Sequence, residues 1–167
     1  QRATQILHHL DQCEILHKQA LAQFSSHLQR ELQVPVSLRA WSPIVSGLIV
    51  ELSGALATIR VLQNDAWRLI AAMSGARDVP SSITKVYAFF ERASKNENNL
   101  PKWLEVINTQ TKDIVANYWE TSGLQLANYR DVDQHFDVLA RGAIFFPENK
   151  EQPRLTILLP DNPEEKA

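Results

Sequence analysis

Cysteine is almost missing from this chain of 167 residues, which contains only Cys13. A lone cysteine cannot form an internal disulfide, and it cannot supply a cysteine-rich zinc module. A single free thiol fits a reducing compartment, so we expect the protein to be cytoplasmic.

Glycine and an excess of charge of one sign are also lacking. With five glycines, the sequence contains no glycine-rich phosphate loop and no Gly-x-Ser-x-Gly nucleophile elbow. The 17 basic and 19 acidic residues leave a net charge of −2. Binding to nucleic acid would therefore have to depend on a local patch or on an assembled dimer.

The longest apolar pattern runs from Ser42 to Gly75. Ser42 and Pro43 suit the start of a helix, and Gly75 suits its end. Between them, apolar residues recur at alternating intervals of three and four, which is a heptad pattern. Its members are Val45, Leu48, Leu52, Ala55, Ile59, Leu62, Ala66, Leu69 and Met73. The pattern predicts one long helix that other helices must cover.

We expect this helix to be the central rod of a bundle, with Leu52, Ile59 and Leu62 nearly fully buried. The most apolar window is interrupted by small and polar residues, namely Ser46, Gly47, Glu51, Ser53 and Gly54. These interruptions argue against a membrane span.

Four further helical segments are predicted around this rod. They run from Thr4 to Gln33, from Ser81 or Ser82 to Ser94, from Pro101 onward, and from Leu124 to about Ala140. Thr121-Ser122-Gly123 should stop or kink the chain between the last two, and Val34 to Trp41 should be a connector.

The residue pattern changes from helical to β-like after Gly142. Two β-like runs, Ala143 to Pro147 and Arg154 to Leu159, flank a polar loop and predict a hairpin. Because two strands alone are marginal in water, the hairpin should lie on the bundle or join a partner's strand. The predicted fold is therefore all-α, an antiparallel bundle of four or five helices with a short C-terminal β-hairpin. Residues 1–142 should form the bundle, and residues 143–167 a hairpin and an acidic tail packed on the same domain.

His9, Cys13 and His17 share one face of the first predicted helix, because they are four residues apart. Their nitrogen and sulfur atoms suit zinc. However, a structural zinc needs four ligands, and three on one straight helix spread along its axis. The alternative is that they are packing residues against the next helix, and this is the interpretation we favour.

A polar stretch near the end of the bundle carries the second candidate site. It places Arg130 and Asp131 five and four residues before His135. Here the chain resembles the HEPN family (higher eukaryotes and prokaryotes nucleotide-binding). Those proteins are small helical bundles with an arginine, often followed by a polar residue, and a histidine four to six residues after the arginine.

The resemblance implies a metal-independent endoribonuclease that dimerises to build one composite site and needs no cofactor. Arg130 would stabilise the phosphate, His135 would be the general acid and base, and Asp131 would position the imidazole. The partners would be a second copy of the chain and RNA or a nucleotide. Helical geometry places Arg130 on the side of its helix away from the core, so a homodimer should bury part of this helix.

Two alternatives stand beside this hypothesis. The motif can be an ordinary solvated helix face, because its spacing also arises by chance; Arg2 with His8 or His9 matches it as well. The chain would then be a non-catalytic helical module that binds other proteins, as a regulatory or toxin–antitoxin partner. Its near-neutral charge and acidic tail favour this second function.

Overall fold

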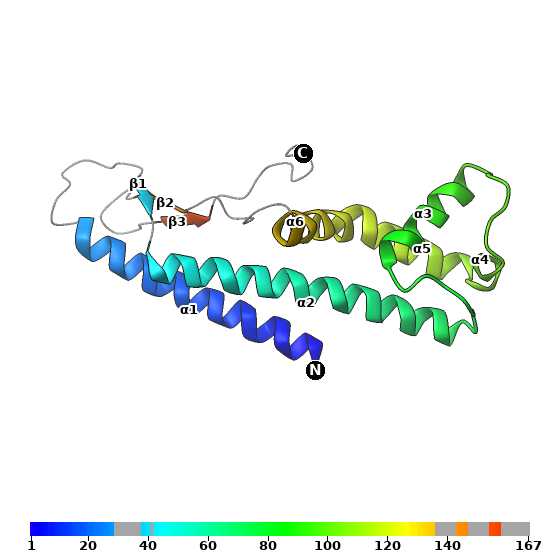
Figure 1. Ribbon diagram of the computed structural model, residues 1–167, viewed down its shortest axis with the longest axis horizontal. Helices are drawn as coiled ribbons and strands as arrows, with labels where there is room; N and C mark the ends of the chain where they lie inside the picture. Colours follow the sequence, from blue (N-terminus) through cyan, green and yellow to red (C-terminus); the bar gives the residue numbers. More distant parts are fainter. Residues whose placement is uncertain (29–37, 41, 136–142, 147–153, 158–167) are drawn as a thin grey trace. The chain divides into compact units, whose positions relative to one another are not determined.

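The computed structural model describes residues 1–28, 38–40, 42–135, 143–146 and 154–157 (Figure 1). Helices dominate, and the predicted all-α bundle with a short C-terminal β element is confirmed. The chain divides into two compact units. The first contains residues 1–58 and 129–167, and the second contains residues 59–128.

Two long helices form the frame of the first unit. α1 (Arg2–Leu28) and the first part of α2 (Pro43–Met73) lie side by side and run in opposite directions (Figure 1). α2 begins as predicted, because Ser42 Oγ accepts a hydrogen bond from the Val45 backbone N–H over 3.3 Å. The end predicted for the first helix, after Leu28, lies outside the described residues.

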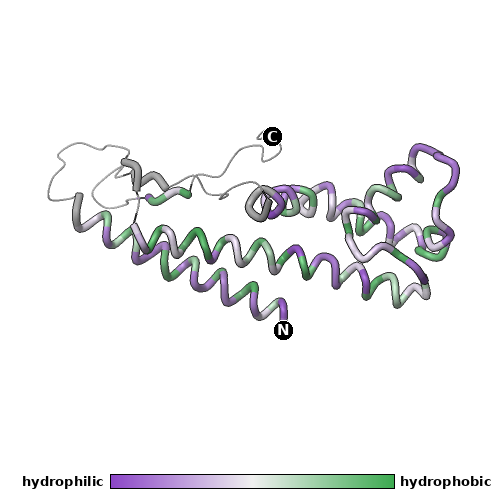
Figure 2. The backbone as a smooth tube through the Cα atoms, in the orientation of Figure 1, coloured by the Kyte–Doolittle hydropathy of each residue, from purple (hydrophilic) through white to green (hydrophobic). Residues whose placement is uncertain are grey.

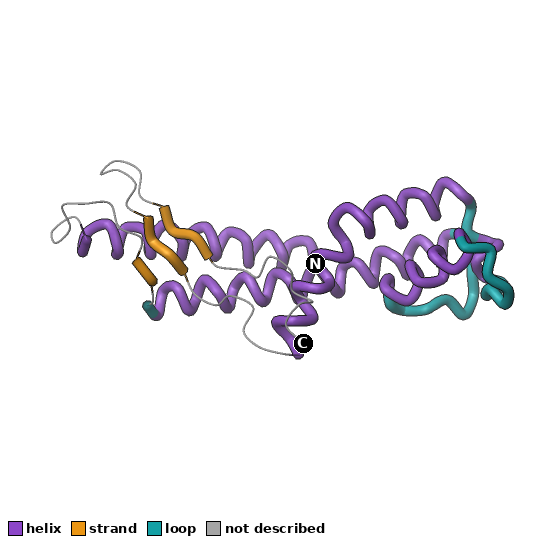
Figure 3. The backbone as a smooth tube through the Cα atoms, turned by 90° about the horizontal axis from the view of Figure 1, so that it is seen from above, coloured by secondary structure: helices purple, strands orange, loops and turns teal. Residues whose placement is uncertain are grey.

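A small sheet covers this helix pair. β2 (Ala143–Phe146) and β3 (Arg154–Ile157) form the predicted antiparallel hairpin, and β1 (Leu38–Ala40) pairs with β2 on its other side. The strand order is β1-β2-β3. Leu155 of β3 joins the buried cluster of this unit, which also contains Ala20, Val45, Leu48 and Ile49. The hairpin therefore lies on the bundle (Figure 3).

β1 falls in the segment that the sequence predicted as a connector. Its three residues are too few to give an alternating pattern, and its partner strand lies far along the chain. The pairing is thus decided by contacts that a local pattern does not contain.

The second unit packs short helices on the last part of α2. They are α3 (Ile83–Ser94), α4 (Trp103–Val106), α5 (Thr109–Tyr118), the π-helical turn η1 (Trp119–Gly123) and the start of α6 (Leu124–His135). Aromatic rings fill its core: Trp67 meets Phe90 and Trp103 edge to face, with ring centroids 6.1 and 6.0 Å apart. The indole N–H of Trp67 is satisfied by the Pro80 carbonyl at 3.1 Å.

The helix predicted from Pro101 onward is interrupted twice. Ile107 is extended between α4 and α5, and the Asn108 side chain caps α5 by accepting from the Thr111 N–H over 2.8 Å. The predicted kink near Gly123 is the η1 turn. A Cβ at Gly123 would lie 2.9 Å from the Trp119 ring, so the tight packing of this turn requires glycine.

The predicted burial of the central helix is wrong in detail. Leu52 and Ile59 are only half-buried, and Leu62 is exposed. A heptad pattern drifts by about 20° per heptad around a straight α-helix. In the second unit the buried side of α2 instead carries Gln63, Trp67 and Ala71, spaced by four. The heptad members Leu69 and Met73 are consequently exposed. Figure 2 shows hydrophobic and hydrophilic residues alternating along α2.

α2 is, among the described helices, the one that is long and apolar enough to cross a membrane. The core helix of a soluble protein meets the same criteria of length and composition, although such helices are mostly buried. In α2, 28% of the most apolar window is buried.

Candidate functional site

Arg130 and Asp131 of the predicted motif lie together on α6. Arg130 Nη1 donates to Asp131 Oδ1 over 2.8 Å. The arginine side chain is 28% exposed, so it is half-buried rather than directed into solvent as the helical geometry predicted. The Arg130 side chain is therefore partly covered rather than fully solvated.

The buried part of Arg130 includes a polar atom. Its Nε is shielded from solvent and has no hydrogen-bond partner among the residues that the structure describes. A buried N–H without an acceptor costs free energy, and most buried polar groups in proteins do have a partner.

His135 is the last residue of α6, and its side chain lies outside the described part of the structure. The structure therefore brings Arg130 to Asp131, while the proposed contact between Asp131 and the imidazole stays a prediction.

His9, Cys13 and His17 each have a partner within the first unit. His9 Nδ1 lies 2.7 Å from Glu51 Oε2, and His17 Nε2 lies 3.0 Å from the Leu155 carbonyl oxygen. The Cys13 thiol faces the Leu48 carbonyl at 4.0 Å. The three side chains join α1 to α2 and to β3, as packing residues do.

Burial and the nearby Glu51 carboxylate raise the pKa of the Cys13 thiol. Because the thiolate is the form that binds metals and attacks electrophiles, this cysteine is a poor ligand and a poor nucleophile. Among the described residues, no group of three His, Cys, Asp or Glu side chains could hold a metal ion.

The second unit contains a groove that the sequence analysis did not find. It has a volume of about 300 Å³ between α2, α3 and α5. Its lining is apolar except for Gln63 and Tyr118. The other lining residues are Ile59, Leu62, Ala66, Trp67, Ile70, Ile83, Ile114 and Val115. The signal in the sequence is Gln63, a polar residue four positions from both Ile59 and Trp67 on α2.

Gln63 is 5% exposed and its amide is fixed by two contacts. Its Nε2 donates to the Tyr118 hydroxyl over 2.9 Å, and Arg60 Nη1 lies 3.4 Å from its Oε1. A guanidinium can only donate, so the amide atom beside it must be the oxygen. The Arg60 guanidinium itself stacks 5.6 Å from the Trp119 ring centroid.

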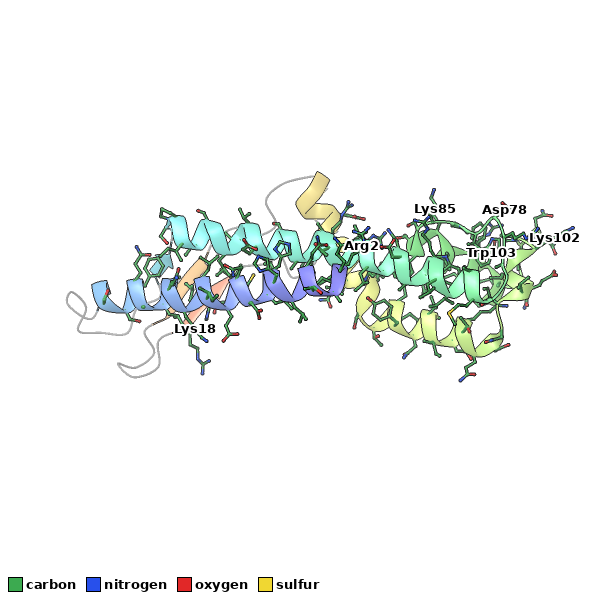
Figure 4. The ribbon with its side chains drawn as sticks, turned by 90° about the horizontal axis from the view of Figure 1, so that it is seen from below. Arg2, Lys18, Asp78, Lys85, Lys102 and Trp103 are labelled. Atoms are coloured by element: carbon green, nitrogen blue, oxygen red, sulfur yellow. The ribbon has the colours of Figure 1, made fainter. Side chains whose placement is uncertain are left out.

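A second cavity of about 390 Å³ lies where the loops of the second unit meet. Asp78, Lys102 and Trp103 line it, with Arg77, Pro80, Phe89 and Pro101 (Figure 4). Its charged side chains, Arg77, Asp78 and Lys102, are all exposed, so none of them forms a buried polar site in this cavity.

No protein-family model matches this chain, and neither a curated protein nor a solved structure matches it. The resemblance to the HEPN family therefore remains a prediction from the Arg130 motif.

Proposed function

We propose that this chain is a helical protein-interaction module, and that a second copy of the chain is one of its partners. The observation that supports this is a row of exposed apolar side chains on the last part of α2. Leu62, Leu69 and Met73 are 36, 62 and 81% exposed and are spaced by seven and four residues. This spacing is that of a helix seam made to pack against another helix.

A second copy suits this row because a twofold axis brings the same seam from both chains together. Fully burying an exposed Leu or Met side chain contributes about 1.5–3 kcal/mol, and Leu62, which is 36% exposed, contributes less. The rows of both copies together still give a substantial driving force for association. A regulatory or toxin–antitoxin partner could use the same row.

Light scattering at tens of micromolar protein tests the proposal. Wild type should be dimeric, and Leu69→Glu should shift it to monomer, because the carboxylate would be buried in the contact. Val50→Glu is the matched control. Val50 is 68% exposed on the same helix, about 100° around it from Leu69. A monomeric wild type, or equal effects of the two variants, would contradict self-association through this row.

A metal-independent ribonuclease of HEPN type is the second candidate function. The observation that favours it is the buried Nε of Arg130, without a partner in the described residues, beside an Nη1 held by Asp131. An arginine oriented in this way can bind a phosphate oxygen and stabilise its developing charge. His135, near the end of the same helix, would move the proton of the ribose 2′-OH.

Incubation of the protein with single-stranded RNA at low salt, with and without EDTA, tests this function. The expected products carry 2′,3′-cyclic phosphate ends, and DNA should stay intact because it lacks the 2′-OH nucleophile. Absence of both binding and cleavage would leave the interaction module as the function.

A further inference from the structure

We propose that the groove between α2, α3 and α5 binds a small amphiphilic monocarboxylate, with its carboxylate at Gln63 and Tyr118 and its hydrocarbon part on the apolar walls. The groove shares Leu62 with the row proposed above for self-association, but neither Leu69 nor Met73 lines it, so different residues test the two proposals.

The polar end of the groove offers two donors that have no acceptor among the described residues. The Gln63 amide nitrogen carries two N–H bonds and gives one to the Tyr118 oxygen. Because Tyr118 accepts this bond, its own O–H must donate elsewhere. Neither the second N–H of Gln63 nor the O–H of Tyr118 has an acceptor among the described residues. Two such donors side by side fit one oxygen of a ligand.

The charge near these donors selects an anion. The Arg60 guanidinium lies against the Gln63 carbonyl oxygen, and it polarises the amide so that its N–H bonds become stronger donors. The lining of the groove contains no acidic residue that would repel a carboxylate. A carboxylate therefore fits this end better than a neutral carbonyl or an ammonium group does.

The remaining walls select the size and polarity of the rest of the ligand. Apart from Gln63 and Tyr118, the lining consists of aliphatic side chains and the Trp67 ring. A volume of about 300 Å³ corresponds to about ten water-sized groups. Octanoate, with ten non-hydrogen atoms, matches this size and carries the predicted head group.

Isothermal titration of the full chain with octanoate tests the proposal. Wild type should bind one octanoate per chain with saturation, and Tyr118→Phe should weaken binding roughly tenfold because it removes one donor to the carboxylate. Octylammonium has the same chain length but the opposite charge and no acceptor, so it should not bind.

Ile114→Asn and Val106→Asn form a matched pair of variants. The two residues are 61 and 50% exposed, but Ile114 lines the groove and Val106 does not. Ile114→Asn should weaken octanoate binding several-fold and Val106→Asn should leave it unchanged, while circular dichroism confirms that both variants are folded.

Three results would overturn the proposal. They are no saturable octanoate binding up to about 10 mM, binding that neither Ile114→Asn nor Tyr118→Phe alters, and octylammonium binding as tight as that of octanoate. Each of these results is separate from the oligomeric state, which Leu69→Glu tests.

Discussion

The imidazole of His9 occupies the space that a side chain at position 54 would need. A Cβ added to Gly54 would lie 2.8 Å from Cε1 of His9, closer than real Cβ contacts allow. The same ring is held 2.7 Å from the Glu51 carboxylate, so it cannot move away without losing that contact. The missing side chain at Gly54 thus allows the His9 ring of α1 to pack directly against the backbone of α2.

Gly54→Ala should lower the free energy of unfolding in wild type, although replacing glycine within a helix ordinarily raises it by about 0.5–1 kcal/mol. In a His9→Ala background the clash is gone, so the same substitution should become stabilising by about that amount. Urea denaturation of the four proteins measures the reversal.

Gly47→Ala is the control for this cycle. Its added Cβ would meet Leu16 at an ordinary 3.6 Å. It should therefore be stabilising with or without His9. Gly54→Ala effects that are equal in both backgrounds would show that His9 does not set the constraint.

Tyr87 should make stability sensitive to high pH. Burial, together with its hydrogen bond to Glu120, raises the pKa of Tyr87 to about 12. The folded state then binds more protons than the unfolded state between about pH 10 and 12. The stabilising contribution is complete below pH 10 and is lost as the pH rises toward 12.

Absorbance at 295 nm should show one of the three tyrosines ionising near pH 12, and Tyr87→Phe should remove that step. Glu120→Gln should lower the pKa of Tyr87, because it removes a neighbouring negative charge. A step near pH 12 that persists in Tyr87→Phe would assign it to another tyrosine.

Trp67 should be among the most important residues for stability in the second unit. It is 1% exposed, and Trp67→Ala should cost roughly 3–5 kcal/mol, since a large cavity would open between Phe90 and Trp103. Leu69→Ala, two residues along the same helix but exposed, should cost less than about 0.5 kcal/mol in the monomer. Urea denaturation at low protein concentration compares them, and similar costs would contradict the burial.

If the chain cleaves RNA, Arg130 and His135 should each be required. Arg130→Ala and His135→Ala should remove most activity, and Arg130→Lys should fail to restore it because lysine lacks the Nε donor. Asp131→Asn should do less, and EDTA should have no effect. The control is Arg92→Ala, which breaks another arginine–carboxylate pair, with Glu97. Full cleavage by Arg130→Ala and His135→Ala would refute the catalytic assignment.

Local signals in the sequence located the helices well. Ser42 and Pro43 mark the start of α2, and Gly75, with φ of +71°, follows its last turn. These elements could be predicted because caps, prolines and positive-φ glycines act within one turn of the chain. The break at Ile107 was not predicted, since no proline or glycine marks it in the sequence.

The two candidate sites could be predicted from the sequence to different degrees. The motif of Arg130, Asp131 and His135 is visible in the sequence, but the burial of the Arg130 Nε is not. The groove of the second unit was missed altogether, because Gln63 and Tyr118 are distant in the chain and meet only when α5 packs on α2.

The sequence by itself determined that α2 is one long apolar helix, because periodicity is a local property of the chain. Only the tertiary structure decided which side of that helix is covered. The heptad pattern pointed to Leu62, Leu69 and Met73, whereas the packed aromatic core selected Gln63, Trp67 and Ala71. The physical reason is that a straight helix turns every 3.6 residues, so a seven-residue pattern leaves the buried side unless a partner helix follows it.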